Sequence, residues 1–149
     1  PIAVLGDSVS LLQQANSRLG DRPNVLGGGP LLMQQGRIVL NGRGEGFSPG
    51  FLALAAPRTV VGNGAGGTWL MTVQGAGGSD PTLLEAALAM QQLGLRDALN
   101  LDGGSSTTMV AAGRPLMNGG GSSPRIHNGL GLVPAQASAD ATQQPLPLW

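Results

Sequence analysis

Glycine constrains the fold of this chain more than any other residue type, because 26 of its 149 residues are glycine and they divide the sequence into short segments. Glycine and proline interrupt regular elements and favour tight turns. Most of the segments between them are apolar runs of strand length, and glycine-containing turns join two pairs of runs as in hairpins. The predicted strands are 31–33, 37–40, 59–61, 68–74, 98–101, 107–111, 115–117 and 126–133. We therefore predict an α+β fold with a mixed, largely antiparallel sheet.

One segment has the pattern of an amphipathic α-helix, from about residue 82 to 93. Thr82 and Glu85 have the spacing of a capping box, in which each side chain binds a backbone donor of the first turn. Gly94 then provides a left-handed stop. A second helix is predicted near residues 8–19.

Composition excludes several classes of protein. Charged residues make up 11% of the chain and the net charge is zero, so we predict no nucleic-acid binding. There is no cysteine, which excludes disulfides and thiolate metal sites. No apolar stretch is long enough to cross a membrane, and we predict no signal peptide within these residues. A chain of this length forms one domain, which we place at residues 1–133, followed by a polar tail at 134–149 that we expect to be disordered. Because the chain opens with Pro1, we expect a processed product or an excised fragment.

The segment from Asn100 to Val110 carries the strongest functional signal. Asp102 ends a short apolar run, and two glycines and four consecutive hydroxyl side chains follow it. Exposed backbone N–H groups in a glycine turn form an anion-binding concavity, and serine and threonine add further donors. This pattern predicts a site for an oxygen-rich anion or a sugar. A plain turn, in which Asp102 only caps the glycine pair, is the alternative.

No other feature points to a cofactor. A hard cation such as calcium binds clustered carboxylates, and the sequence has no acidic cluster with the spacing of an ion site. We therefore predict no metal and no required cofactor.

Several short segments, in one order along the chain, resemble the carboxy-terminal part of the phosphodiester glycosidase family. The matching segments are 27–32, 56–62, 82–87, 97–104 and 124–125. The resemblance implies a mixed α/β fold, a chain that is part of a larger domain, and cleavage of the bond between a sugar's anomeric carbon and a phosphodiester oxygen. It also implies an extracytoplasmic location, in the periplasm, the cell envelope or a secreted form, and a role in exopolysaccharide or other carbohydrate metabolism.

The sequence departs from the family pattern in three places. Ser105 stands where the family usually has a third glycine, and Gln74 where it often has aspartate. If position 105 required a positive φ, serine would be strained there. The amino-terminal half of the family, with its Asn-Gly-Gly-Phe-Phe-like segment, is not found. We therefore expect either an amino-terminal fragment of the same precursor as a partner, or only part of an active site.

The chemistry of the reaction suggests roles for individual residues. A phosphodiester leaving group needs little protonation, so cations can replace the usual general acid. Asp102 is predicted to act as the nucleophile or as the base that positions water, and Glu85 as a second acid or base. Arg58 and Arg125 are candidates to clamp the phosphate, because a guanidinium can bind two phosphate oxygens. The alternatives are a capping role for Glu85 and solvated strand ends for the arginines.

Other predicted site residues surround these groups. Asn100 lies on the same strand face as Asp102 and is predicted to orient that carboxylate or a sugar hydroxyl. His127, the only histidine, is a secondary candidate, although a lone strand histidine usually has a structural partner. The remaining predicted substrate or phosphate ligands are Gly103, Gly104, Ser105, Ser106 and Thr107.

The sequence leaves three functions open. The first is the hydrolase described above, with a glycan or sugar phosphate as substrate. The second is a non-catalytic module that binds carbohydrate or a phosphate-containing polymer. The third is a scaffold in which the glycines serve only close packing of the sheet.

Overall fold

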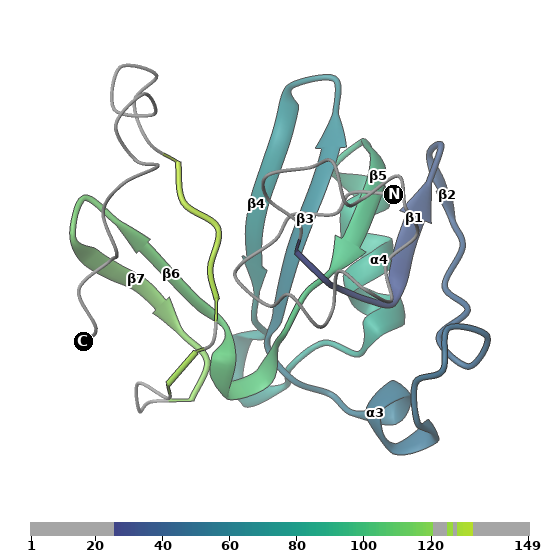
Figure 1. The fold of residues 1–149 in the computed structure, drawn as a ribbon, viewed down its shortest axis with the longest axis horizontal. Coiled ribbons are helices and arrows are strands. Elements are labelled where there is room, and N and C mark those ends of the chain that lie inside the picture. The colour runs from purple at the N-terminus through teal and green to yellow at the C-terminus, as the bar shows by residue number, and fades with distance from the viewer. Residues whose placement is uncertain (1–25, 121–124, 127, 133–149) are drawn as a thin grey trace, which may run out of the picture.

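The computed structural model describes residues 26–120, 125–126 and 128–132 (Figure 1). Five strands form the main sheet in the order β2-β1-β5-β3-β4, and β6 and β7 form a separate hairpin. The strands are β1 Leu31–Gln34, β2 Arg37–Ile38, β3 Arg58–Gly64, β4 Gly67–Val73, β5 Leu95–Asn100, β6 Thr108–Ala111 and β7 Arg114–Asn118. The helical elements are α3 Pro49–Ala53, α4 Leu83–Gln92 and two 3₁₀ turns, η1 Ala76–Gly78 and η2 Gly104–Ser106. Every strand pair is antiparallel, which confirms the α+β prediction.

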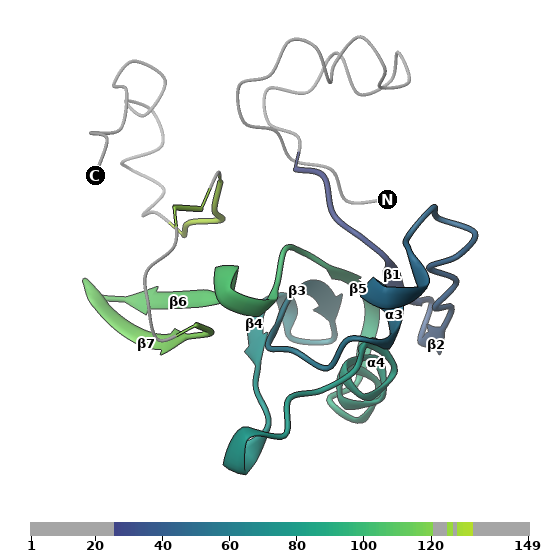
Figure 2. The ribbon, with the colours of Figure 1, turned by 90° about the horizontal axis from the view of Figure 1, so that it is seen from below.

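Helix α4 covers one face of the main sheet (Figure 2). Thr82 caps it, with the Thr82 side chain accepting from the Glu85 backbone N–H and the Glu85 side chain accepting from the Thr82 backbone N–H. Gly94 follows the helix at φ +77°, as predicted. The core lies between this helix and β1, β3 and β5, and its buried residues are Leu32, Met33, Val60, Leu83, Ala86, Ala87, Met90, Leu95 and Ala98.

The structure differs from the sequence prediction in three strands. Strand β5 starts at Leu95, three residues earlier than predicted, because it leaves the helix stop directly and pairs with the far end of β3. Strand β2 is shorter than predicted. The predicted final strand at 126–133 is wrong for its described residues, which form no strand, because they pair with no other described strand. The predicted helix at 8–19 and the predicted tail at 134–149 lie outside the described residues.

Short helix α3 was not predicted. Ser48 caps it by accepting from the Phe51 backbone N–H, and Pro49 occupies its first turn. Phe47 and Phe51 stack with their ring centroids 5.1 Å apart. The segment therefore forms a compact connection between β2 and β3, below the sheet in Figure 1.

The antiparallel topology gathers particular strand ends at one edge of the sheet. Strands β1 and β3 begin at this edge, β4 and β5 end there, and α4 begins there, at the lower side of Figure 1. This edge positions the predicted functional residues.

Candidate active site at the lower edge of the sheet

The loop that follows β5 presents Asp102 to solvent. Pairing with β3 continues one residue beyond the strand, where the Leu101 N–H donates to the Thr59 carbonyl at 2.8 Å. Asp102 is exposed, and its Oδ1 accepts from the Gly103 N–H at 3.0 Å. The other carboxylate oxygen has no hydrogen-bond donor among the described residues. Asp102 therefore caps the glycine turn through one oxygen and still exposes its carboxylate to solvent.

Glycine allows this loop to lie against the start of β3. The Gly104 N–H donates to the Pro57 carbonyl at 2.7 Å, and Gly104 has a φ of +62°. A Cβ on Gly103 would lie 2.8 Å from the Pro57 carbonyl oxygen, which is closer than such atoms approach in real proteins. Ser105 is not among the described residues with positive φ, so the strain considered for it does not arise. Gly104 therefore provides the positive φ of the loop, and Gly103 allows its close approach to Pro57.

The hydroxyl residues of the loop divide into exposed and buried ones. Ser105 is exposed and Ser106 is half-buried, so both can reach a ligand at the surface. Thr107 is fully buried, and its Oγ1 accepts from the Thr59 hydroxyl at 3.3 Å. The Thr107 carbonyl accepts from the Gly119 N–H at 2.7 Å. Thr107 therefore anchors the loop between β3 and the end of the β6–β7 hairpin.

Asn100 is buried, with 1% of its surface exposed, two residues before the exposed Asp102. Its Nδ2 donates to the Gly29 carbonyl at 2.8 Å and to the Leu101 carbonyl at 2.9 Å. Two carbonyl neighbours fix the orientation of the amide, because Oδ1 could not donate to them. Oδ1 is buried and has no hydrogen-bond partner among the described residues. Asn100 thus ties the glycine segment before β1 to the loop that carries Asp102.

Arg58 begins β3 directly behind the loop, and only 2% of its surface is exposed. Its Nε donates to the Pro81 carbonyl at 3.3 Å, and its Nη2 donates to the Leu54 carbonyl. The guanidinium carbon lies 5.9 Å from the centroid of the Phe51 ring, in cation–π geometry. Arg58 therefore joins α3, the start of α4 and β3 at the candidate site.

The charge of Arg58 is set by two opposing effects. Burial lowers the pKa of the Arg58 guanidinium, and the negative charge of Asp80 acts in the opposite direction. Arginine remains protonated in proteins, so a positive charge is held behind the loop. Asp80 was not singled out from the sequence. Its place directly before Pro81, at the entry to α4, was the available signal.

Glu85 is engaged by the start of α4. Its Oε2 accepts from both the backbone N–H and the hydroxyl of Thr82, each at 2.8 Å. The backbone hydrogen bond, followed by that of the hydroxyl, holds the pKa of Glu85 below its usual range. The carboxylate is thus exposed, ionised at neutral pH and bound to its own helix cap.

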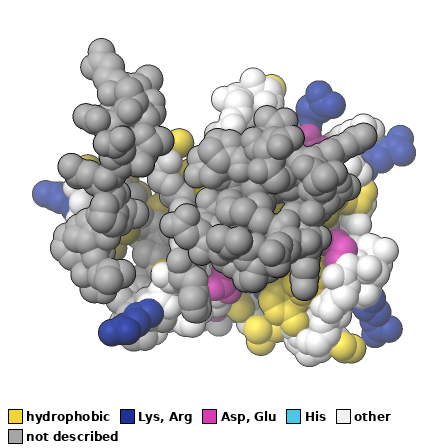
Figure 3. All heavy atoms as spheres, in the orientation of Figure 1, with side chains coloured by type: hydrophobic (Ala, Val, Ile, Leu, Met, Phe, Trp, Pro, Cys, Tyr) yellow, Lys and Arg dark blue, Asp and Glu magenta, His cyan; other side chains and the backbone are white. Residues whose placement is uncertain are grey.

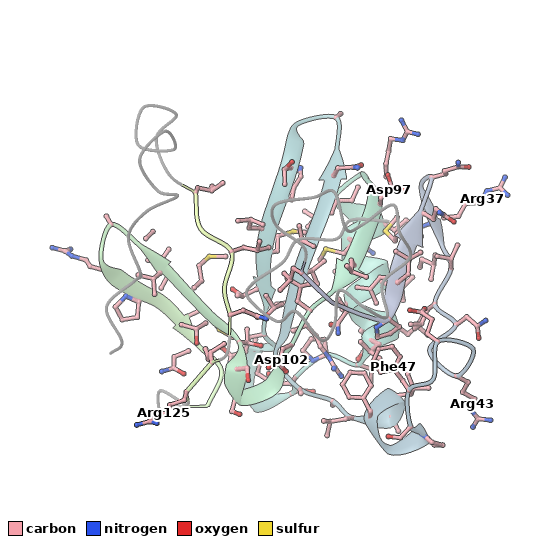
Figure 4. The ribbon with its side chains drawn as sticks, in the orientation of Figure 1. Arg37, Arg43, Phe47, Asp97, Asp102 and Arg125 are labelled. Atoms are coloured by element: carbon pink, nitrogen blue, oxygen red, sulfur yellow. The ribbon has the colours of Figure 1, made fainter. Side chains whose placement is uncertain are left out.

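Arg125 and His127 complete the set of predicted residues. Arg125 is exposed, and Figure 4 shows its side chain pointing outward, away from the loop that carries Asp102. His127 lies outside the described residues. The structure therefore brings Arg58, Asn100 and the 102–107 loop together at one edge, and it leaves Arg125 apart from them.

Glu45 is another carboxylate that the sequence reading did not assign to the site. Both of its oxygens lie 3.1 Å from the Leu31 N–H, at the start of β1. Glu45 thus binds the first residue of β1 at the lower edge, beyond the two residues of β1 that pair with β2. The Gly-Glu-Gly-Phe run at 44–47 was the only signal in the sequence.

The arrangement of the other charged side chains fits the low content of charged residues, 11% of the chain. On the face shown in Figure 3, the visible arginines are spread around the margin of the molecule instead of forming one basic patch. Across the described part of the chain, no three His, Cys, Asp or Glu side chains are grouped so that they could hold a metal ion. A search of the same residues for a helix long and apolar enough to span a membrane finds none.

Comparisons with known proteins show which family the chain resembles. A crystal structure of a hypothetical protein from Synechocystis is 40% identical, with a TM-score of 0.62 over 70% of this chain. The catalytic domain of zebrafish N-acetylglucosamine-1-phosphodiester alpha-N-acetylglucosaminidase, auto-inhibited by its pro-peptide, is 25% identical, with a TM-score of 0.55 over 63% of this chain. No match was found among proteins with curated descriptions.

The present chain covers 20% of the Synechocystis chain and 34% of the zebrafish chain, so it spans only part of either solved relative. The family description Phosphodiester glycosidase matches residues 2–133, which is most of the sequence. The chain therefore belongs to the phosphodiester glycosidase family.

Proposed function

We propose that this chain carries the catalytic carboxylate of a hydrolase that cleaves the anomeric bond of a sugar-1-phosphodiester. The observation that supports this most directly is the exposed carboxylate of Asp102, just after the end of β5, on a loop whose glycines let it pack closely against the start of β3. Membership of the phosphodiester glycosidase family supports the substrate class.

The reaction replaces one bond to the anomeric carbon by another. The bond between this carbon and the phosphodiester oxygen breaks, and its electron pair leaves with the phosphate. Asp102 either attacks the carbon itself, with water completing the hydrolysis, or accepts a proton from the attacking water. Because the leaving phosphate is already a weak base, the reaction places little demand on a general acid.

Groups around Asp102 are proposed to hold the phosphate. The hydroxyl groups of the exposed Ser105 and the half-buried Ser106 are the donors in the loop, because the N–H groups of Gly103 and Gly104 already donate to Asp102 Oδ1 and to the Pro57 carbonyl. The buried positive charge of Arg58 favours an anion at this edge. Arg125 is proposed as the second cation for the phosphate, which requires its exposed side chain to turn from its outward orientation toward the loop.

Glu85 is proposed as the second acid or base. Its lowered pKa favours the ionised form, which suits a base better than an acid. Its contacts with Thr82 supply the competing explanation, in which Glu85 serves only the helix cap.

The experiment compares two substrates that share a sugar. One is a methyl phosphodiester of the sugar at its anomeric carbon, and the other is the methyl glycoside. Release of sugar from the phosphodiester alone is expected, because only that substrate carries the anionic leaving group. Equal rates on the two substrates, or no release from either one, would contradict the proposed function.

A non-catalytic module that binds carbohydrate or a phosphate-containing polymer is the second candidate. The observation in its favour is that the chain spans only a fifth to a third of its solved relatives. Saturable binding of the phosphodiester without release of sugar would support this alternative.

On the grounds of family membership we propose an extracytoplasmic location and an amino-terminal fragment of the same precursor as a partner. Cell fractionation followed by mass spectrometry tests both.

A further inference from the structure

The middle of the main sheet is apolar on both of its faces. On β3, Val60 faces the core under α4, and its neighbour Val61 faces the opposite side with only 5% of its surface exposed. On β5, Ala98 and Leu99 alternate in the same way. An antiparallel sheet with one solvated face normally alternates apolar with polar residues. The apolar row of Val61, Leu70 and Leu99 in the middle of this second face is therefore typical of a face that is covered by protein.

A groove runs along this second face. Val61 pairs with Leu70 on β4 and with Leu99 on β5, so the three side chains lie next to one another. They line a groove of about 210 Å³, which we call the leucine groove. Its other described lining residues are Thr68 and, outside the strands, Leu26, Leu101, Leu130, Gly131 and Leu132. Leu132 lies at its margin and is 88% exposed. No charged side chain is among the described residues that line the groove.

We infer that the leucine groove is the docking surface for another polypeptide segment of the same gene product, which belongs to the remainder of the family domain. The coverage of the solved relatives supports this occupant, because this chain accounts for 20% and 34% of their lengths. The uncharged lining requires a segment whose contacting face is aliphatic or aromatic.

The position of the groove links this docking to the candidate site. Leu101 lines the groove and directly precedes Asp102 in the chain. A segment seated on the groove therefore lies close to the loop that carries the proposed catalytic carboxylate. This last step rests on the proposed function, whereas the docking itself does not.

Cysteine labelling tests the docking directly, because the 149 residues contain no cysteine. Leu70→Cys places a thiol in the groove. Leu116→Cys is the matched control, because Leu116 lies on β7 outside the groove lining and is 65% exposed. Each variant is made in the recombinant 149-residue chain and in the gene product expressed in its own host, and the rate of reaction with a maleimide is measured.

In the host gene product we expect the thiol at position 70 to react at least roughly tenfold more slowly than in the 149-residue chain, with the thiol at 116 unaffected. Equal reactivity at position 70 in the two preparations, or a host product of only 149 residues, would overturn the inference. Protection that depends on the concentration of the 149-residue chain would indicate a second copy instead, and protection by octyl phosphate would indicate a small apolar ligand. Labelling needs no catalysis, so its outcome is independent of whether sugar is released.

Discussion

Replacement of Gly103 by alanine tests whether the loop is shaped to hold Asp102. Gly103 has φ −132° and ψ −157°, an extended conformation that any residue adopts, so alanine is not opposed by the backbone. The obstacle is steric, because the new Cβ would lie 2.8 Å from the Pro57 carbonyl oxygen. Carbon and oxygen atoms in favourable contact are about 3.3 Å apart, so the loop must move by roughly 0.5 Å.

This displacement affects both stability and activity. Overpacking of this kind costs about 1–3 kcal/mol of the free energy of unfolding. At this chain length each kcal/mol lowers the melting temperature by roughly 2–4 °C. The carboxylate of Asp102 moves with the loop, and an error of about 1 Å in a catalytic group can cost on the order of a hundredfold in rate. We therefore expect hydrolysis of the phosphodiester to fall about tenfold or more in Gly103→Ala.

Gly50→Ala in α3 is the control, because a Cβ there meets nothing within 4 Å and the residue lies inside a helix. It is expected to be neutral or to stabilise the protein by about 0.5–1 kcal/mol. Urea denaturation and steady-state hydrolysis are measured for both variants. An unchanged free energy of unfolding in Gly103→Ala would refute the steric reasoning.

Four further changes have defined outcomes. Gly104→Ala places alanine at a φ of +62° with free space around its Cβ, so it should lose about 1–2 kcal/mol in urea denaturation from backbone strain alone. Arg58→Lys replaces a guanidinium that donates to two carbonyls by a single ammonium, and a loss of about 1–3 kcal/mol is expected in the same assay; full stability would contradict the structural role. Asn100→Asp turns the donor that faces two carbonyls into an acceptor, so thermal melting at neutral pH should show a loss of about 1–3 kcal/mol. Thr82→Ala removes one of the donors that lower the pKa of Glu85. A carboxylate whose pKa is lower in the folded than in the unfolded protein stabilises the fold at pH values above its unfolded pKa. This stabilisation is lost as the pH falls through the folded pKa. Denaturation measured from neutral to acid pH should therefore show a smaller loss of stability on acidification in this variant than in the wild type, and parallel curves would count against the capping interaction.

Local signals in the sequence predicted the elements that depend on neighbouring residues. Thr82, Glu85 and Gly94 define the helix within a dozen residues, and the structure confirms its cap and its stop. The hairpin of β3 and β4 was recognised from its glycine turn. The start of α3 carried a comparable signal in Ser48 and Pro49, but five residues are too few for a periodic pattern.

Long-range contacts could not be derived in this way. Strand β5 lies between β1 and β3, and this order depends on packing between segments that are distant in the sequence. The exposure of Asp102 was foreseen, because the two glycines follow it directly. The burial of Arg58 was not, since its partners at Leu54 and Pro81 meet only when α3 and α4 converge on β3. The hydrogen bond from Thr59 to Thr107 is of the same kind.

Asp102→Asn is the most direct test of the central claim that the loop presents a catalytic carboxylate. Asp97→Asn is the matched control, because Asp97 lies in the first half of β5, away from the loop that follows this strand, and its Oδ1 accepts from the Gln35 N–H at 2.9 Å (Figure 4). Both variants keep the shape of the side chain and lose its charge, and hydrolysis of the phosphodiester is measured beside the free energy of unfolding. We predict that Asp102→Asn lowers the rate by roughly 10²–10⁴-fold at unchanged stability, while Asp97→Asn retains activity. A rate for Asp102→Asn equal to that of the wild-type protein would contradict the claim.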